Sequence, residues 1–504
     1  MLPRLLTHQR RQWQILSGIE RESARARVIW NREELGTWEE IGARCFLMRG
    51  RIHIRFEHLR RGVEFRVVSL RLFAEGVRVF LSGLQGSEPE EMIILLQEPR
   101  HRRRPRERLL GVAQAWLDRH APGAVILHST RRLDLGNSLS GCLLRVHARH
   151  AGQDQLVLVS PSDQSGDRSG EILTQALVWA SALARNRRLL GTPRLVLLVP
   201  SDRSAVAGHR ARYLSRACCL AELWEYDPDD GARAQPAPPP PPPREYRDFR
   251  WPVLGPFRWS AALAQVMDLA PAEIRRYPRF QEYDSLRLRG LEFARVEGLD
   301  RDRITFGVGT QRHELTADNL EALEALVEGI LYFRRADTPN AHHPLYRMQA
   351  ERWLESSILD RCGHLFPELA PGSLYSQIPV YLGDRQGRVD ILGADKEGTL
   401  VVMELKVSED VGLPLQALDY WGRVIEHNQM GDFEKRGYFS EVRLNRERPR
   451  IYLVSPVFSF HDTTETILEY VDPGIEIWKI AVNVDWRCGV KVLSRTRVKG
   501  RQAR

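Results

Sequence analysis

The spacing of apolar side chains changes character along the chain. Before residue 98 it has a two-residue period, clearest over 45–56 and 64–73, which is typical of half-buried β-strands. Over 247–345 it predicts strands near 286–293 and 304–308, and then a helix near 319–331 with a 3.6-residue period. The sequence therefore predicts a β-rich domain over 1–98 and a small α+β domain over 247–345.

From about residue 346 the pattern becomes more regular. Residues 350–359 predict an amphipathic helix, because Glu351, Leu354, Glu355 and Ile358 fall on one face. The elements predicted after it are a strand at 387–392, a turn at 395–398, a strand at 399–407, a helix from 414 and a strand at 450–455. We expect these elements to form one domain over 346–504.

Two acids and a lysine stand on the predicted strand pair. Asp390 lies in the first strand, and Glu404 and Lys406 point to the same face of the second, since side chains two apart on a strand do so. The carboxylates of Asp390 and Glu404 and the carbonyl of Leu405 are hard oxygen ligands suited to Mg²⁺, with Mn²⁺ as a substitute. The sequence therefore predicts a divalent metal site.

An acid on the predicted helix and Lys406 would complete a site for phosphodiester hydrolysis. Glu351 or Glu355 would finish the metal shell, and the pattern leaves the choice between them open. Phosphodiester hydrolysis needs an activated water and stabilisation of the negative charge that develops on phosphate. An ammonium group such as that of Lys406 can orient the water and neutralise that charge.

These motifs resemble the PD-(D/E)xK, or restriction-endonuclease-like, nuclease superfamily. The resemblance rests on Glu351, Asp390 and the run from Glu404 to Lys406, together with Gln416 and Tyr420, which are similar to the QxxxY motif of RecB-type nucleases. The same segment also resembles the catalytic domain of mismatch-specific endonucleases. The resemblance implies a four-stranded mixed sheet flanked by helices, metal-dependent cleavage of DNA, and catalytic roles for these residues.

Residues 99–230 look like a second copy of this domain without its acids. Glu107 precedes Glu351 by 244 residues, and Ser160 precedes Glu404 by the same offset. In that register Val146 replaces Asp390, and Ser160 and Ser162 replace Glu404 and Lys406. The sequence therefore predicts a duplicated α/β fold with a degenerate N-terminal copy and an intact C-terminal copy. The degenerate copy would either hold DNA or act as the partner of the intact copy in an internal pseudo-dimer.

Composition narrows the class of protein. Residues 231–246 include six consecutive prolines, Pro238 to Pro243, and predict an extended linker. A net charge of +9 and a pI near 9.4 suit a polyanionic partner, DNA. No apolar run reaches the roughly 20 residues that a membrane helix needs, so we expect a cytoplasmic protein with no membrane partner. Two functions remain: a nuclease acting in repair, recombination or defence, or a binding or scaffold protein that keeps a nuclease fold without turnover. DNA is the expected substrate of the nuclease, and RNA stays an alternative, because the nuclease motifs do not distinguish the two sugars.

Overall fold

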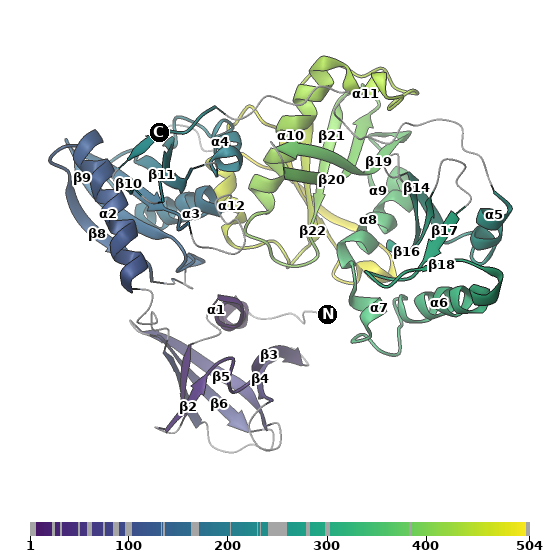
Figure 1. Cartoon of the computed structure of the whole chain (residues 1–504), viewed down its shortest axis with the longest axis horizontal. Coiled ribbons are helices and arrows are strands. Elements are labelled where there is room, and N and C mark those ends of the chain that lie inside the picture. The colour runs from purple at the N-terminus through teal and green to yellow at the C-terminus, as the bar shows by residue number, and fades with distance from the viewer. Residues whose placement is uncertain are drawn as a thin grey trace. The chain divides into compact units, whose positions relative to one another are not determined.

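A computed structural model shows a mixed α/β chain with several sheets flanked by helices (Figure 1). It describes residues 7–499 apart from 23–25, 31–32, 49–50, 58–62, 74–75, 84–89, 96–102, 133, 135–136, 163–170, 202, 229, 232, 240–259, 279–282, 298–302 and 383–384. Half of the predicted linker, residue 232 and residues 240–246, therefore lies outside the described residues, and residues 234–236 within it form a strand. The chain divides into two compact units, 1–211 with 216–238 and 212–215 with 239–504.

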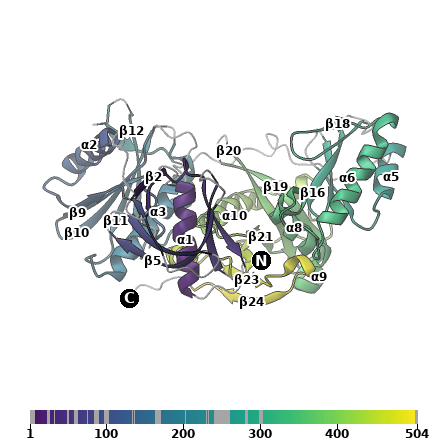
Figure 2. The ribbon, with the colours of Figure 1, turned by 90° about the horizontal axis from the view of Figure 1, so that it is seen from below.

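The first unit begins with an antiparallel sheet, as the two-residue period predicts. Its seven strands follow the order β2-β1-β7-β6-β5-β4-β3. The elements are α1 (Thr7–Glu22), β1 (Arg27–Trp30), β2 (Glu33–Thr37), β3 (Ala43–Met48), β4 (Arg51–Phe56), β5 (Val63–Phe73), β6 (Gly76–Gly83) and β7 (Glu90–Leu95). Helix α1 lies against one face of this sheet (Figure 2), where Ile15, Leu16 and Ile19 join its core.

A mixed sheet of six strands, in the order β13-β12-β11-β10-β9-β8, forms the rest of the first unit. The elements are α2 (Arg103–His120), β8 (Val125–Thr130), β9 (Leu144–His150), β10 (Gln153–Val159), α3 (Ile172–Arg185), β11 (Arg194–Pro200), α4 (Ala205–Ala211), β12 (Leu220–Tyr226) and β13 (Ala234–Pro236). Helix α2 begins at Arg103, within the basic run at 100–106.

The second unit opens with a five-stranded antiparallel sheet that carries two helices. The elements are α5 (Ala261–Asp268), β14 (Ile274–Pro278), β15 (Tyr283–Leu288), β16 (Leu291–Glu297), β17 (Arg303–Phe306), β18 (His313–Glu314), the 3₁₀ turn η5 (Ala317–Asn319) and α6 (Leu320–Phe333). Leu323, Val327 and Ile330 of α6 are buried at a helical spacing, which confirms the predicted amphipathic helix.

The second unit ends with another six-stranded mixed sheet, in the order β19-β20-β21-β22-β23-β24. The elements are α7 (Pro344–Arg347), α8 (Ala350–Asp360), α9 (Cys362–Leu365), β19 (Leu369–Leu382), β20 (Arg385–Asp395), β21 (Leu400–Leu405), α10 (Leu413–Met430), α11 (Asp432–Lys435), β22 (Arg450–Pro456), α12 (Thr463–Leu468), β23 (Ile477–Val482), η6 (Trp486–Cys488) and β24 (Val492–Arg497). This sheet has six strands where the resemblance implies four.

The two six-stranded sheets share one pattern of strand directions. Counted in chain order, from β8 in one sheet and from β19 in the other, the first three strands are antiparallel to one another in turn. The third, fourth and fifth strands are parallel, and the sixth is antiparallel to the fifth. Each sheet has a long helix before its first strand and another between its third and fourth strands. Among the described residues, no helix combines the length and the apolar character needed to cross a membrane.

The β19–β24 sheet is covered on both faces. Trp353, Leu354 and Ile358 of α8 pack against one face, and Tyr420 and Val424 of α10 pack against the other. Strand β21 is buried along its whole length, and its neighbours β20 and β22 run on either side of it. A central strand in such a position holds its side chains rigidly, so the carboxyl end of β21 is a fixed place for a site.

Candidate active site

The hairpin of β20 and β21 brings the two predicted acids together. Ile391 pairs with Met403, so the next pair along the strands is Asp390 with Glu404. The backbone N–H of Leu405 donates to Oδ2 of Asp390 over 2.9 Å. The hairpin turn fixes this register, because Oδ1 of the buried Asp395 accepts the N–H of Thr399 over 2.8 Å. A one-residue slip would send the two acids to opposite faces of the sheet.

Lys406 lies just beyond the end of β21, and its ammonium group stays beside Glu404. The backbone N–H of Lys406 donates to the carbonyl of Val454 over 3.0 Å, so the residue continues the line of the strand. Its Nζ lies 3.3 Å from Oε1 of Glu404 and 3.9 Å from Oδ2 of Asp410. The other oxygen of Glu404, Oε2, is buried and accepts no hydrogen bond from any described residue.

Helix α8 supplies a third acid, Glu351, in its first turn. Glu351 lines a pocket of about 260 Å³ together with Asp390, Arg352 and Val407. The charges of Lys406 and Asp390 both act on Glu351, so the three side chains share one electrostatic environment. The structure therefore brings Glu351, Asp390, Glu404 and Lys406 to one place at the carboxyl end of β21.

Glu355, the other candidate from α8, is buried and already paired. Its Oε2 accepts hydrogen bonds from Arg352 (3.0 Å) and from Gln377 (2.7 Å), and its Oε1 accepts one from Ser376. Arg287 lies 3.6 Å from the same Oε1. Glu351 faces the pocket and Glu355 faces the protein interior, so the geometry favours Glu351 as the helix acid of the site.

Burial raises the pKa of every acid in this group. For Asp390, burial and then the charge of Glu355 raise the pKa to about 6. Burial and then Asp390 hold the pKa of Glu404 well above its usual range, and burial also raises the pKa of Glu351 against the opposing charge of Lys406. Burial alone would lower the pKa of Lys406, but the surrounding acids outweigh it and move the pKa upward, so the ammonium stays charged.

Gln416 and Tyr420 are also near the site, on α10. Nε2 of Gln416 donates to the Tyr420 hydroxyl over 3.0 Å, and burial followed by the charge of Glu404 raises the pKa of Tyr420 to about 12. The ring lies against Gly387 of β20, where a Cβ would come 2.5 Å from Cε1 of Tyr420. Gly387 therefore makes room for the ring beside the acids.

The acids suit a divalent cation in their chemistry, although they do not form a complete ligand cluster. Among the described residues, no three His, Cys, Asp or Glu side chains lie close enough together to hold a metal ion. The unpartnered Oε2 of Glu404 is nevertheless a buried carboxyl oxygen that a cation would satisfy. With Asp390 opposite and Glu351 facing the pocket, the donors are the carboxylates that Mg²⁺ and Mn²⁺ prefer.

Sequence reasoning missed three residues at this site. Gln377 and Arg287 contact the acids from elements that no motif marks, and each is far from its partners along the chain. The role of Gly387 could have been predicted from the sequence, because a glycine inside a strand often marks a position that another group approaches closely. Glu351 is an example of a residue that the helical period did identify.

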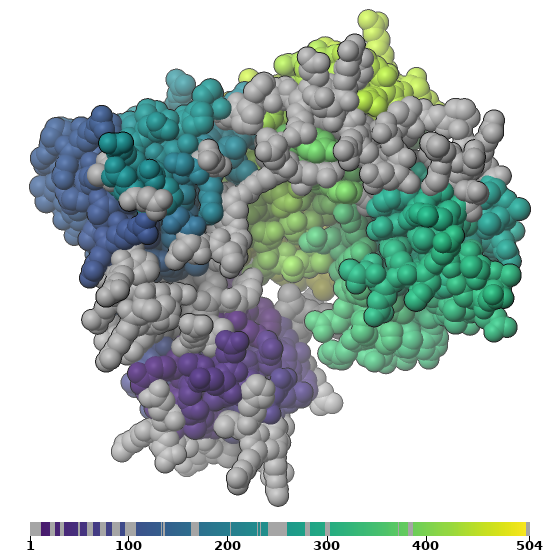
Figure 3. Space-filling model, in the orientation of Figure 1, coloured from purple at the N-terminus to yellow at the C-terminus, as the bar shows by residue number. Residues whose placement is uncertain are grey.

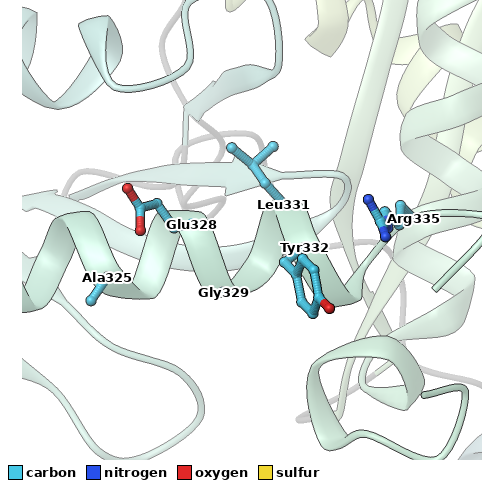
Figure 4. A pocket seen from close by; sticks show the side chains of 6 residues that line it. All are labelled: Ala325, Glu328, Gly329, Leu331, Tyr332 and Arg335. Atoms are coloured by element: carbon cyan, nitrogen blue, oxygen red, sulfur yellow. The ribbon is translucent and has the colours of Figure 1, made fainter. Parts of the chain in front are cut away.

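A larger pocket, of about 580 Å³, lies elsewhere in the second unit. It runs along the exposed side of α6 (Figure 4), in the green segment whose surface is visible in Figure 3. It is lined by Ala325, Glu328, Gly329, Leu331, Tyr332 and Arg335. None of the site residues predicted from the sequence lines this pocket, so it is separate from the acid cluster.

Comparison with known proteins identifies no family for the chain. No protein-family model matches it, and no curated protein matches it at a significant level.

Proposed function

We propose that this protein is a Mg²⁺-dependent DNA nuclease whose active site is formed by Asp390, Glu404, Lys406 and Glu351. One observation carries the proposal: the half-buried Asp390, the buried Glu404 and the ammonium group of Lys406 meet at the end of a central strand, and one carboxyl oxygen, Oε2 of Glu404, has no partner among the described atoms. Burying such a group costs about 1–3 kcal/mol. A cation at this place would remove that cost.

Each residue has a role in the proposed hydrolysis. When bound by Asp390 and Glu404, Mg²⁺ would supply positive charge that polarises the phosphate and makes an attacking water more acidic. The Lys406 ammonium, held by Glu404, would neutralise negative charge that develops on the phosphoryl oxygens. Glu351 would orient water at the mouth of the pocket, and Tyr420 would hold the wall of the site behind Glu404 through its contact with Gly387.

We also infer that the two six-stranded sheets are copies of one restriction-endonuclease-like domain. Beyond their common strand order, they share an ion pair and an indole contact at the same place. Arg194 pairs with Glu222 over 2.6 Å, and Arg450 lies 3.3 Å from Glu476. In each copy a tryptophan two residues further on, Trp224 or Trp478, donates its indole N–H to that glutamate. Chance does not readily repeat such a triad.

The first copy lacks the proposed chemistry. The register pairs Leu144 with Val159, which puts Leu143 opposite Ser160. Asp390 therefore corresponds to Leu143, three residues before the Val146 that the constant offset indicates. A leucine and a serine cannot hold a cation. With one active copy, we expect the protein to nick duplex DNA rather than cut both strands.

The test is cleavage of labelled plasmid, linear and branched DNA with Mg²⁺ or Mn²⁺. The variants are Lys406→Ala and, as a matched control, Lys396→Ala, which removes an exposed lysine from the turn of the same hairpin. We expect the first to slow cleavage about a thousandfold, corresponding to roughly 4 kcal/mol of lost transition-state stabilisation, and the second to leave it unchanged. Equal cleavage by both variants would place the activity elsewhere, and no cleavage by the wild type would favour a DNA-binding scaffold.

A further inference from the structure

Helix α8, which carries two of the acids, is held from outside its own sheet. The turn between β15 and β16 lies against it. At Gly290 of that turn φ is +77°, and a Cβ there would lie 2.1 Å from the carbonyl oxygen of Arg352. Only glycine fits such a backbone contact. The β14–β18 sheet therefore contacts the first turn of α8 directly, through the backbone of this turn.

An arginine of this sheet continues the contact into the acid cluster. Arg287 of β15 is 2% exposed, stacks over the ring of Tyr277 at 4.3 Å, and lies 3.6 Å from Oε1 of Glu355. Its Nε donates to Oγ of Ser285 over 3.2 Å. An arginine buried this fully is costly unless it compensates a buried charge. Here the compensated charge is Glu355.

Gln377 of β19 connects Glu355 to Asp390. Its Nε2 donates to Oε2 of Glu355 over 2.7 Å and to Oδ1 of Asp390 over 3.0 Å. Both amide hydrogens are thereby used, which fixes the orientation of the amide, and its Oε1 is buried without a partner among the described residues. The strand register places Gln377 directly opposite Asp390.

The backbone of Gln377 is strained to make this connection. Its φ of +59° lies in the left-handed region, in the middle of a strand. For a residue with a Cβ, this conformation costs roughly 1–2 kcal/mol. Such strain persists where the surroundings over-determine it, and it concentrates at functional sites.

We propose that Gln377 is a positioning residue that orients the Asp390 carboxylate for a divalent cation, and that Arg287 anchors it through Glu355. The inference rests on the proposed nuclease function and extends the site to the β14–β18 sheet. Nε2 of Gln377 engages Oδ1 of Asp390 while the N–H of Leu405 engages Oδ2, so the carboxylate is held at both oxygens. Loss of a partner that orients a metal ligand typically weakens metal affinity about 10–100-fold.

The test compares Mn²⁺ binding, measured by calorimetry on the full chain, in Gln377→Asn, Gln377→Gly and Asp390→Asn. Asparagine and glycine both tolerate positive φ, so they keep or relieve the backbone conformation. The asparagine side chain is one methylene too short to span both acids. We expect each Gln377 variant to bind Mn²⁺ about 10–100-fold more weakly than the wild type, to lose cleavage mainly through a higher Mn²⁺ requirement, and to unfold in urea no earlier than wild type.

A second pair of variants tests the anchor. Arg287→Met leaves Glu355 with less compensation and can destabilise the fold by itself, whereas Arg287→Met with Glu355→Met removes both charges and restores stability. We expect weakened Mn²⁺ binding to persist in the double variant. Wild-type affinity in Gln377→Asn or in the double variant, with no binding by Asp390→Asn, would overturn this inference and leave the nuclease proposal standing. Equal Mn²⁺ binding by Asp390→Asn and wild type would instead overturn the nuclease proposal.

Discussion

Replacing Asp390 with asparagine should make the metal-free protein more stable at neutral pH. Burial and the charge of Glu355 raise the pKa of Asp390 from 3.8 to about 6 in the folded state. Between pH 3.8 and about pH 6, the folded protein therefore still binds a proton that the unfolded chain has released. Above pH 6 the buried charge works against folding, and asparagine removes that charge.

The magnitude follows from the pKa difference. A difference of about two pH units corresponds to about 3 kcal/mol at neutral pH. Asparagine can keep one of the two hydrogen bonds that Asp390 makes, with Leu405 or with Gln377, and loses about 1 kcal/mol for the other. The net expectation is a gain of about 2 kcal/mol in the free energy of unfolding.

Hydrogen exchange in urea, measured on peptides from β20 and β21, reports this domain apart from the rest of the chain. The gain should be full at pH 7.5 and shrink as pH falls from about 6 towards 4, because the folded wild type then keeps its proton. Near pH 4, close to the ordinary pKa of 3.8, the gain should be gone. At still lower pH only the lost hydrogen bond remains, so the variant should be about 1 kcal/mol less stable than the wild type. Added Mg²⁺ should stabilise the wild type alone, by about 2.7 kcal/mol at a hundred times its Kd. With metal, the wild type would therefore be more stable than Asp390→Asn, the opposite of the order without metal.

Asp395 provides the matched control on the same strand. It is fully buried, accepts the N–H of Thr399, and pairs with Arg450. Asp395→Asn should therefore lower stability at pH 7.5, because this carboxylate is compensated. The reasoning would be refuted if Asp390→Asn were no more stable than wild type without metal, or if its advantage persisted unchanged at pH 4.

Three further predictions concern activity. At subsaturating Mg²⁺, cleavage should rise with pH through about 6 as Asp390 loses its proton, and higher Mg²⁺ should move the midpoint of the pH–rate profile downward, because metal and proton compete. Gly387→Ala should displace the ring of Tyr420, costing about 1–3 kcal/mol in urea unfolding and most of the cleavage rate. Ser160→Glu with Ser162→Lys should create no second active site, because Leu143 stands opposite; plasmid assays should still show nicked product and no linear DNA.

The sequence predicts the acid pair well because strand geometry is local. A two-residue period and a short hairpin are enough to place Asp390 opposite Glu404, and the structure has that pairing. Lys406 is near Glu404 as predicted, although the strand ends one residue earlier, at Leu405. The helix of Glu351 and Glu355 begins at Ala350 as predicted. These features depend on residues within about one turn or one hairpin of each other.

The choice between Glu351 and Glu355 does not follow from the sequence. The helical period puts both on one face, and the deciding contact comes from Arg287, on a strand that packs against α8 only in the folded chain. If the two sheets are copies as proposed, the strand registers match Asp390 with Leu143 and not with Val146, for a related reason. The hairpin of β9 and β10 has longer paired strands than that of β20 and β21: Leu143 and Ser160 are 17 residues apart, whereas Asp390 and Glu404 are 14 apart. An offset that holds on the second strand of the hairpin is therefore three residues off on the first.

The acid cluster divides into a compensated part and an uncompensated part. Glu355 has Arg287 and Arg352 beside it and faces the interior, whereas Glu404 has only Lys406 and keeps one oxygen without a partner among the described residues. A network built only for stability would satisfy that oxygen, since leaving it unpaired costs about 1–3 kcal/mol. Asp390, which lies opposite Glu404 on the neighbouring strand, lines the pocket. That asymmetry is what a binding site for a cation requires, because the missing positive charge must come from outside the chain.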